Sequence, residues 1–273
     1  MNEAELRAKA KEIRQRVLQM ALKAGKGHVP PAFSWTEIAV TLYYGGILQY
    51  DPLRPDWAGR DRFILSKGHA CLTLYAILAD KGFFPSTELD KFAGPGALLP
   101  GHPDVAIPGV EAVSGSLGHG LGIGSGMALG ARIDALDWMV FVVLGDGECD
   151  EGSVWEAAMF AGHHRLENLV AIIDRNRLSA TDFTENVLAL EPLDERWRAF
   201  GWDVSTVDGH SFPDLIAAFS KVREKRTKRP HMIIANTVKG KGVEFMQNSP
   251  EWHHRLPKGD SVSQAFGELE KSK

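Results

Sequence analysis

The sequence predicts an α/β fold: a mostly parallel sheet with helices on both faces. Two unbroken apolar runs, Met139–Leu144 and Leu169–Ile173, are typical of strands buried on both faces. A helix-length segment, Ser153–Glu167, separates them and predicts one β-α-β unit with a right-handed crossover. Predicted strands and helices alternate along the rest of the chain. We find no repeat and no domain boundary, so we expect residues 1–273 to form a single domain.

Four elements are predicted before the long loop. Apolar residues at helical spacing indicate a helix over Glu3–Lys23. A Ser-x-x-Glu capping box that begins at Ser34 predicts a second helix over Ser34–Tyr44. A short strand, Phe63–Leu65, then leads through a turn into a helix that ends near Lys81.

Five further elements are predicted in the remainder. Segment 93–115 is rich in Gly and Pro and is expected to be a long loop. A glycine-rich helix over Ser116–Leu136 precedes the β-α-β unit. A connecting helix and a strand, Trp202–Val207, follow that unit. A helix with proline in its first turn starts near Pro213, and a buried strand, His231–Thr237, comes last.

Composition places the chain among ordinary soluble globular proteins, with 44% apolar and 24% charged residues. The formal charge of −4, from 31 basic and 35 acidic residues, argues against nucleic-acid binding. The two cysteines, Cys71 and Cys149, are too few for a disulfide framework, so a reducing cytoplasm is expected. Charges throughout the first turns argue against a signal peptide, and no apolar run is long enough to cross a membrane.

Two polar residues follow the central strands and predict a metal site. Asp146 comes directly after the first strand of the β-α-β unit, and Asn176 follows the second. Neighbouring parallel strands end at the same edge of a sheet, where ligands of open α/β sheets bind. Carboxylate and amide oxygens suit Mg²⁺, and the flanking Gly145 and Gly147 allow a diphosphate to approach the backbone. The alternative is ordinary turn chemistry at both positions.

Glycines recur every fourth residue in the helix predicted over Ser116–Leu136, at Gly118, Gly122, Gly126 and Gly130. Each glycine inside a helix costs roughly 1 kcal/mol relative to alanine, so close approach of a helix, a subunit or a ligand is expected here. A dinucleotide fingerprint fits poorly because these glycines do not lie in a strand-to-helix turn. A nicotinamide dehydrogenase is therefore discounted.

Several histidines follow glycines at the ends of predicted elements, namely His28, His69, His102 and His119. Neutral imidazoles can hydrogen-bond sugar hydroxyls or transfer protons near pH 7. A catalytic zinc is the rival interpretation, but no pair has the i, i+4 spacing that supports it. Glu151, in the loop after Asp146, is either a helix-start acid or an acid near a cofactor or a subunit contact.

Five short motifs and one asparagine resemble those of a known enzyme family. They are Leu65-Ser-Lys-Gly-His69, Pro100-Gly-His102-Pro, Pro108-Gly-Val-Glu, Gly115-Ser-Leu-Gly-His-Gly, Gly145-Asp-Gly-Glu-Cys-Asp-Glu-Gly152 and Asn176. Together they resemble the amino-terminal, diphosphate-binding part of transketolase, and most of all the smaller chain of split bacterial transketolases. The resemblance runs from Gly27-His28 to Trp252-His253-His254, nearly the full length.

The resemblance implies the ligands of a cofactor. Asp146, Asn176 and the backbone carbonyl of Leu178 would hold Mg²⁺. The residues that would contact thiamine diphosphate are His69, Gly115, Ser116, Leu117, Gly147, Glu148 and Asn176.

The resemblance also assigns substrate and subunit roles. His28 and His102 would face the sugar, and either His253 or His254 would contact cofactor and substrate. Glu151 would join an acid network that links the two cofactor sites of a dimer. The chain departs from the family at Val29-Pro30-Pro31, where a further glycine is usual, and at His119, where many members have glutamine.

The implied reaction moves a two-carbon ketol unit from a ketose to an aldose, with sugar phosphates as the expected substrates. The family activates the cofactor with a glutamate on a pyrimidine-binding domain, which we do not find in these 273 residues. We therefore expect the chain to be inactive alone and to need a second, pyrimidine-binding chain, in a heterotetramer where it also self-associates. The alternatives are a 2-oxo acid dehydrogenase α-chain, a deoxyxylulose-phosphate-synthase-like enzyme and a non-catalytic cofactor-binding scaffold.

Overall fold

The computed structural model describes residues 1–224 and 227–271. As the sequence predicts, these residues form an α/β fold around a parallel sheet, with strands in the order β1-β2-β3-β5-β4. The strands are β1 (Arg62–Leu65), β2 (Val140–Gly145), β3 (Leu169–Arg175), β4 (Asp203–Asp208) and β5 (His231–Asn236). The central strands β2 and β3 are buried along their whole length, which explains their unbroken apolar sequences.

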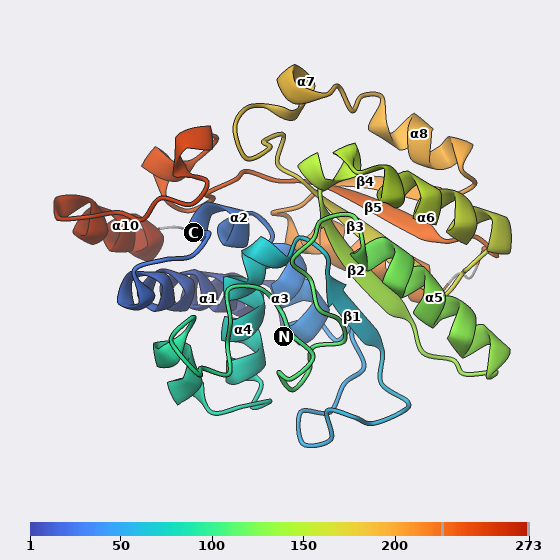
Figure 1. Ribbon diagram of the computed structural model, residues 1–273, viewed down its shortest axis with the longest axis horizontal. Coiled ribbons are helices and arrows are strands. Elements are labelled where there is room, and N and C mark those ends of the chain that lie inside the picture. Colours follow the sequence, from blue (N-terminus) through green and yellow to red (C-terminus); the bar gives the residue numbers. More distant parts are fainter. Residues whose placement is uncertain (225–226, 272–273) are drawn as a thin grey trace.

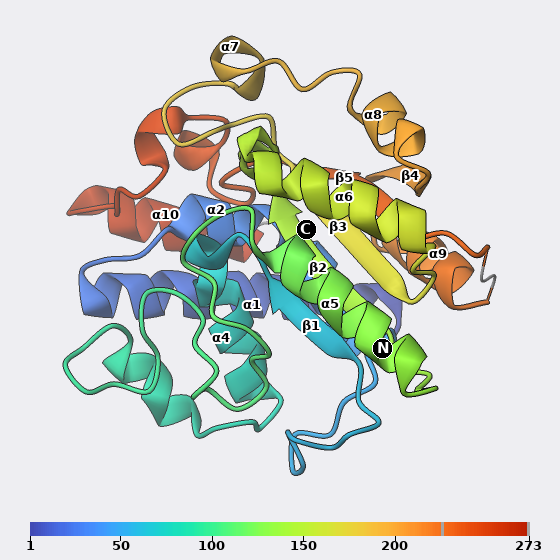
Figure 2. The ribbon, with the colours of Figure 1, turned by 45° about the vertical axis from the view of Figure 1, so that its right-hand side comes forward.

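Helices cover both faces of the sheet (Figures 1 and 2). On one face lie α1 (Glu3–Ala24), α2 (Val29–Ser34), α3 (Thr36–Tyr44), α4 (Cys71–Asp80), α9 (Phe212–Glu224) and α10 (Asp260–Lys271). On the other lie α5 (Gly120–Ile133), α6 (Gly152–His164) and α8 (Leu193–Ala199). The short α7 (Thr184–Val187) sits in the loop that follows β3. The 3₁₀ helices are η1 (Gly68–Ala70), η2 (Ser86–Lys91), η3 (Gly147–Asp150), η4 (Glu244–Met246) and η5 (Pro250–Trp252).

Each face of the sheet has its own hydrophobic core. Alternate residues of β2 divide between them: Phe141 and Val143 pack against the α1 side, whereas Val142 and Leu144 pack against the α5 side. The second core also holds the indoles of Trp197 and Trp202, which meet edge to face with ring centroids 5.1 Å apart. Burial on both sides fixes the register of the central strands, and hence the position of the residues that follow them.

Two sequence-based boundaries are wrong. Ser34 does not cap a helix but ends α2, and its buried hydroxyl oxygen lies 2.9 Å from the carbonyl oxygen of Pro31. Glu37 pairs with Arg14 instead of closing a capping box. The glycine-rich helix begins at Gly120, not at residue 116, because Gly118 has a left-handed φ of +85° and lies in the preceding turn.

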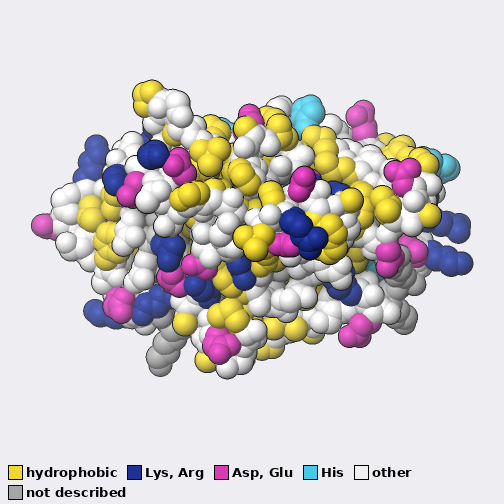
Figure 3. Space-filling model, turned by 90° about the horizontal axis from the view of Figure 1, so that it is seen from below, with side chains coloured by type: hydrophobic (Ala, Val, Ile, Leu, Met, Phe, Trp, Pro, Cys, Tyr) yellow, Lys and Arg dark blue, Asp and Glu magenta, His cyan; other side chains and the backbone are white. Residues whose placement is uncertain are grey.

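Two observations bear on membranes and nucleic acids. Among residues 1–224 and 227–271, no helix combines the length and apolar character needed to cross a bilayer. On the face drawn in Figure 3, basic and acidic side chains are interspersed with apolar ones rather than gathered by sign. That face therefore offers no broad basic surface to a phosphate backbone.

Candidate active site

The candidate site lies where the parallel strands end. Register places Gly145 of β2 opposite Asp174 of β3, so Asp146 and Asn176 emerge side by side as predicted. A pocket of about 220 Å³ opens at this edge. It is lined by Pro31, Lys67, His69, Leu117, Gly145, Asp146, Gly147, Glu148, Asn176, Leu178, Ser179, Ala180, Lys239 and His253. Most of the residues expected to bind the cofactor are thus brought together.

Asp146 is a buried carboxylate with an incomplete set of partners. One oxygen, Oδ1, accepts the backbone N–H of Gly147 at 2.9 Å. The other, Oδ2, accepts the backbone N–H of Arg177 and, at 3.3 Å, a guanidinium nitrogen of Arg175. Burial, and then the nearby carboxylate of Asp174, raise the pKa of Asp146 to about 6. A bound cation would offset the cost of keeping this charge in the pocket.

The amide of Asn176 is oriented by its neighbours. Its nitrogen donates to Oδ2 of Asp174 at 3.2 Å, and its oxygen accepts the backbone N–H of Leu178 at 3.1 Å. The oxygen therefore points away from Asp174 and retains a lone pair for a ligand. The carbonyl of Leu178, the third expected metal ligand, accepts a hydrogen bond from Lys239 at 3.3 Å and also keeps a lone pair.

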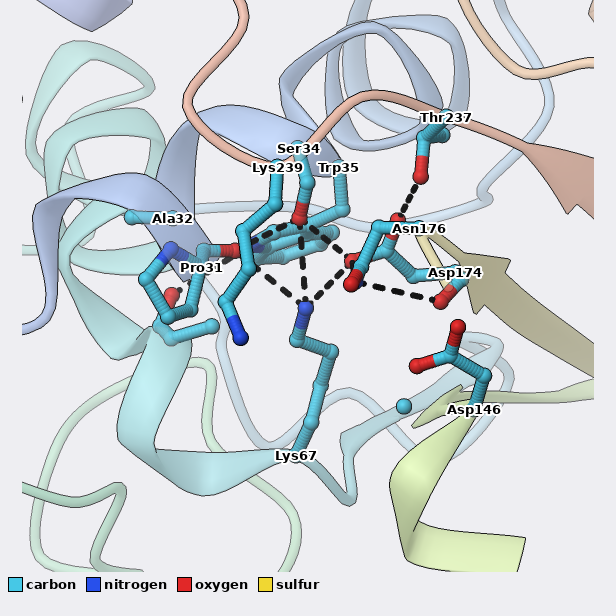
Figure 4. A network of polar contacts seen from close by, with 12 residues as sticks. Pro31, Ala32, Ser34, Trp35, Lys67, Asp146, Asp174, Asn176, Thr237 and Lys239 are labelled. Carbon is cyan, nitrogen blue, oxygen red and sulfur yellow. Dashed lines mark hydrogen bonds and ion pairs between the residues drawn. The ribbon is translucent and has the colours of Figure 1, made fainter. Parts of the chain in front are cut away.

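A buried ion pair lies next to Asn176 at this edge of the sheet (Figure 4). The ammonium of Lys67 and the carboxylate of Asp174 are 2% and 0% exposed, respectively. Asp174 also accepts hydrogen bonds from the hydroxyls of Ser34 and Thr237. Although burial acts to raise it, these partners hold the pKa of Asp174 below its usual range. The network joins α2 and the ends of β1, β3 and β5 to the amide of Asn176.

Glu148 fastens the glycine turn after β2 to the neighbouring loops. Its carboxylate accepts the backbone N–H groups of Gly118 at 2.9 Å and Gly145 at 3.0 Å, and the hydroxyl of Ser66. Because these three hydrogen bonds hold the side chain among the neighbouring loops, it is the backbone of Glu148 that would face a diphosphate. Gly68 lets the turn before His69 approach this region, since a Cβ there would lie 2.0 Å from the carbonyl oxygen of Ser114.

Lys239 carries a second ammonium into the pocket. Its Nζ donates to the carbonyl of Ser179 at 2.8 Å, in addition to that of Leu178. Burial, and then repulsion from Lys67, lower the pKa of Lys239 to about 8. Near pH 7 the ammonium is therefore charged and can attract an anion into the pocket, beside the backbone of the glycine turn after β2.

Three histidines form a cluster at the pocket. The ring centroids of His28, His69 and His253 are 5.3–5.5 Å apart in each pair. Burial is the main reason that the pKa falls to about 4 for His28 and about 3 for His253, and it also lowers the pKa of His69. All three rings are therefore neutral at physiological pH, as the sequence interpretation requires. The Nδ1 atom of His253 is buried without a hydrogen-bond partner among the described residues.

Four other expected residues are exposed and lie at the rim. The ring of His254 is exposed and 6.3 Å from that of His28, so His253 rather than His254 reaches the pocket. His102 is exposed, yet close enough to contribute to the lowered pKa of His28. Gly115 and Ser116 are exposed beside Leu117, which lines the pocket. The departure at Val29–Pro31 forms the start of α2, with proline in its first turn.

Glu151 and His119 do not line this pocket: His119 lines a groove between α5 and α6, and Glu151 lies beside that groove. Glu151 is exposed at the start of α6, against Gly118. The groove is lined by Gly118, His119, Gly122, Ile123, Ser125, Gly126, Ser153, Glu156, Ala157 and Phe160. At Gly122, Gly126 and Gly130, no described atom outside the local backbone lies within 4 Å of where a Cβ would be. At Gly124, by contrast, a Cβ would lie 2.6 Å from a methyl carbon of Val142 in the sheet.

Four functional-site residues were missed by the sequence interpretation, namely Lys67, Lys239, Asp174 and Arg175. The same rule that found Asp146 could have found the lysines, because both follow the ends of parallel strands. Arg175 is 1% exposed and joins Asp146 to the glutamates of the following loop, Glu185 and Glu191. No local signal marks that role. The zinc alternative finds no support, since the described residues contain no group of three or more His, Cys, Asp or Glu arranged to hold a metal.

Comparison with known proteins bears on this geometry. The family model for "Transketolase, thiamine diphosphate binding domain" matches residues 6–268. An apulose-4-phosphate transketolase subunit of Phocaeicola vulgatus is 40% identical over 264 residues, covering 97% of this chain and 93% of that protein. The 6-deoxy-6-sulfo-D-fructose transketolase subunit SqwG of Clostridium sp. is 41% identical over 268 residues, covering 98% and 97%.

One-chain transketolases match over part of their length. Human transketolase is 39% identical over 255 residues, which are 93% of this chain but 40% of that protein. The crystal structure of Campylobacter jejuni transketolase superimposes with a TM-score of 0.93 at 29% identity, covering 99% of this chain and 43% of that one. These matches favour the transketolase interpretation over the dehydrogenase, synthase and scaffold alternatives. The chain belongs to the transketolase family and carries its thiamine diphosphate-binding domain.

Proposed function

We propose that the chain is the diphosphate-binding subunit of a split transketolase that depends on thiamine diphosphate and Mg²⁺. The enzyme transfers a two-carbon ketol unit from a ketose to an aldose, with sugar phosphates or close analogues as substrates. The observation that carries the proposal is the pairing of Asp146 and Asn176 at the carboxyl edge of the sheet, inside a pocket that also holds two ammonium groups. Residues 1–273 act as a single domain.

A carboxylate oxygen of Asp146, the amide oxygen of Asn176 and the carbonyl of Leu178 would hold Mg²⁺. These are hard oxygen donors, few in number, and Mg²⁺ takes its remaining ligands from phosphate and water. The fit is supported by the buried charge on Asp146 and by the orientation of the Asn176 amide. Gly147, Glu148 and Lys239 line the same pocket, where the two backbones and the ammonium would face the diphosphate.

His69 and Leu117 line the pocket, and with the exposed Gly115 and Ser116 they would contact the rest of the cofactor. When bound, thiamine diphosphate supplies the carbanion stabilisation that breaking a carbon–carbon bond beside a ketone requires. The protein orients it and excludes water from the site.

The histidines bind the sugar and move its protons. His28, His69 and His253 are neutral, so each ring can donate from one nitrogen and accept at the other. An unprotonated ring nitrogen can accept the proton of a sugar hydroxyl and return it later in the cycle. His102 and His254 lie at the rim and contact the outer part of the sugar.

A second chain supplies the pyrimidine-binding domain and its activating glutamate. Support comes from the relatives that match this chain over nearly their whole length and are named as subunits. The open glycine face of α5 and the apolar groove beside α6 bind a second copy of this chain, with Glu151 at the contact. The assembly is a cytoplasmic heterotetramer.

The test is an activity assay with and without the partner. The chain is purified alone and co-expressed with a pyrimidine-binding chain, which is sought first in the neighbouring reading frame. Both samples receive thiamine diphosphate, Mg²⁺, a panel of ketose phosphate donors and an aldose phosphate acceptor. We expect ketol transfer only from the complex. Turnover by the chain alone contradicts the split architecture, and a loaded complex that is inactive on every donor contradicts the reaction.

A further inference from the structure

Three hydrogen-bonded charged and polar side chains form a triad that does not line the pocket; two of them are buried and the third is partly buried. The two terminal guanidinium nitrogens of Arg14, on α1, donate to the carboxylate of Glu37, on α3, at 2.6 and 2.7 Å. His210, in the loop between β4 and α9, lies with its Nδ1 2.8 Å from Oε2 of the same carboxylate. Burial acts to raise the pKa of Glu37, but Arg14 and His210 hold it at about 2. The carboxylate is therefore charged at any physiological pH.

The second nitrogen of the His210 ring faces the chain that leads into the pocket. Its Nε2 accepts the backbone N–H of Val238 at 2.8 Å. A backbone N–H can only donate, so Nε2 carries no proton here. The proton must then sit on Nδ1, where it is donated to Glu37. The carboxylate thus fixes one tautomer of His210, and that tautomer presents an acceptor to Val238.

Val238 directly precedes Lys239, whose ammonium lines the pocket. Other backbone hydrogen bonds also hold the loop after β5: the N–H of Thr237 donates to the carbonyl of Arg175 at 3.1 Å, and the N–H of Asn248 donates to the carbonyl of Lys239 at 3.0 Å. Gly240 has a left-handed φ of +83° and donates its N–H to the carbonyl of Pro30 at 3.1 Å. Gly242 lies against the triad itself, since a Cβ there would be 3.4 Å from Cδ of Arg14. Lys239 itself reaches across to the carbonyl of Ser179 at 2.8 Å.

We infer that His210 is a positioning residue for Lys239: the neutral imidazole, oriented by Glu37 and Arg14, fixes the backbone at Val238 and so aims the ammonium of Lys239 at the diphosphate. This inference rests on the proposed role of Lys239 in cofactor binding. It assigns His210 no contact with cofactor or substrate. Its effect reaches the site through one hydrogen bond to the backbone.

Two substitutions test the two ring nitrogens of His210 one at a time. The amide nitrogen of His210→Asn takes the place of Nδ1, so this variant keeps the bond to Glu37 and loses the acceptor for Val238. The amide oxygen of His210→Gln takes the place of Nε2, so this variant keeps the acceptor and loses the bond to Glu37. We expect His210→Asn to weaken thiamine diphosphate binding about tenfold and His210→Gln to change it less than about twofold.

Cofactor affinity is measured by isothermal titration calorimetry of the complex with thiamine diphosphate in excess Mg²⁺. Lys239→Met is included alone and combined with His210→Asn. If His210 acts through Lys239, His210→Asn costs little further affinity in the Lys239→Met background. A full tenfold loss in that background, or equal losses in the Asn and Gln variants, would overturn the inference. Wild-type complex that binds no cofactor would instead refute the proposed function.

A measurement on the wild-type protein covers the case in which a variant does not fold. Hydrogen exchange followed by mass spectrometry reports the amide of Val238 within its peptide. We expect this amide to be protected, because its N–H donates a hydrogen bond to the partly buried ring of His210. Exchange as fast as that of an exposed loop amide would overturn the inference without any substitution.

Discussion

Replacing Lys67 by methionine should destabilise the protein by about 3 kcal/mol at pH 7. The substitution leaves the carboxylate of Asp174, which is 0% exposed, without its countercharge. Breaking a buried pair from one side typically costs about 3–5 kcal/mol. The lower end is expected here because Asp174 keeps hydrogen bonds from the hydroxyls of Ser34 and Thr237 and from the amide of Asn176.

The assay is urea denaturation at constant ionic strength, with Lys23→Met as the matched control. Lys23 and Asp90 form an ion pair at 3.0 Å whose side chains are 57% and 63% exposed, so its loss should cost less than about 1 kcal/mol. The double variant Lys67→Met with Asp174→Asn should lose less than the sum of the two single losses.

The effect also has a definite pH dependence. In the wild type the pKa of Asp174 is lowered, so its contribution to stability is present above the pKa of an unfolded aspartate, about 3.9, and is lost as the pH falls through the lower folded value. In Lys67→Met, protonation removes the unpaired charge, so the difference from wild type should narrow towards acid pH. A loss no larger than that of Lys23→Met, or strictly additive losses, would refute the role assigned to this pair.

Two further predictions concern the glycine helix and the histidine cluster. Gly124→Ala should destabilise the chain by about 1–3 kcal/mol, because its Cβ would lie 2.6 Å from Val142. Gly122→Ala, on the open face of the helix, should stabilise the isolated chain by about 0.5–1 kcal/mol and weaken self-association in sedimentation experiments. The reverse order of stabilities in urea denaturation would contradict the packing described. Because the pKa of His28 is lowered to about 4, folding stability should fall as the pH drops from about 6.5 towards 4, where the unfolded chain binds a proton that the folded chain does not. His28→Gln should make the dependence of folding stability on pH shallower over this range. The change should be smaller than the roughly 1.4 kcal/mol per pH unit expected for the uptake of one whole proton, because the ring is partly exposed. An unchanged dependence would show that burial does not keep His28 neutral.

The sequence predicted the sheet and the metal edge because both depend on local patterns. A strand buried on both faces is apolar at every position, so β2 and β3 were recognisable, and parallel pairing then placed Asp146 beside Asn176. The capping box failed because a Ser-x-x-Glu pattern does not reveal whether tertiary partners compete for its side chains. Ser34 is buried and hydrogen-bonded to Asp174, and the carboxylate of Glu37 pairs with Arg14 and His210.

The rest of the site depends on contacts between residues far apart in the chain. Lys67 and Asp174 are 107 positions apart, and His210 lies 173 positions from Glu37. The structure likewise decides between His253 and His254, because the ring of His253 lines the pocket whereas that of His254 is exposed. Such pairings are set by the fold as a whole, and composition or motif spacing alone does not predict which residues will meet.

The central claim is that two neighbouring strand ends hold the cation that binds the cofactor's diphosphate. Calorimetric titration of the Asp146→Ala complex with thiamine diphosphate and Mg²⁺ tests it most directly, with Asp134→Ala, an exposed aspartate at the end of α5, as the control. We expect cofactor binding to be lost in the first variant and unchanged in the second. Undiminished uptake of thiamine diphosphate by Asp146→Ala would contradict the account.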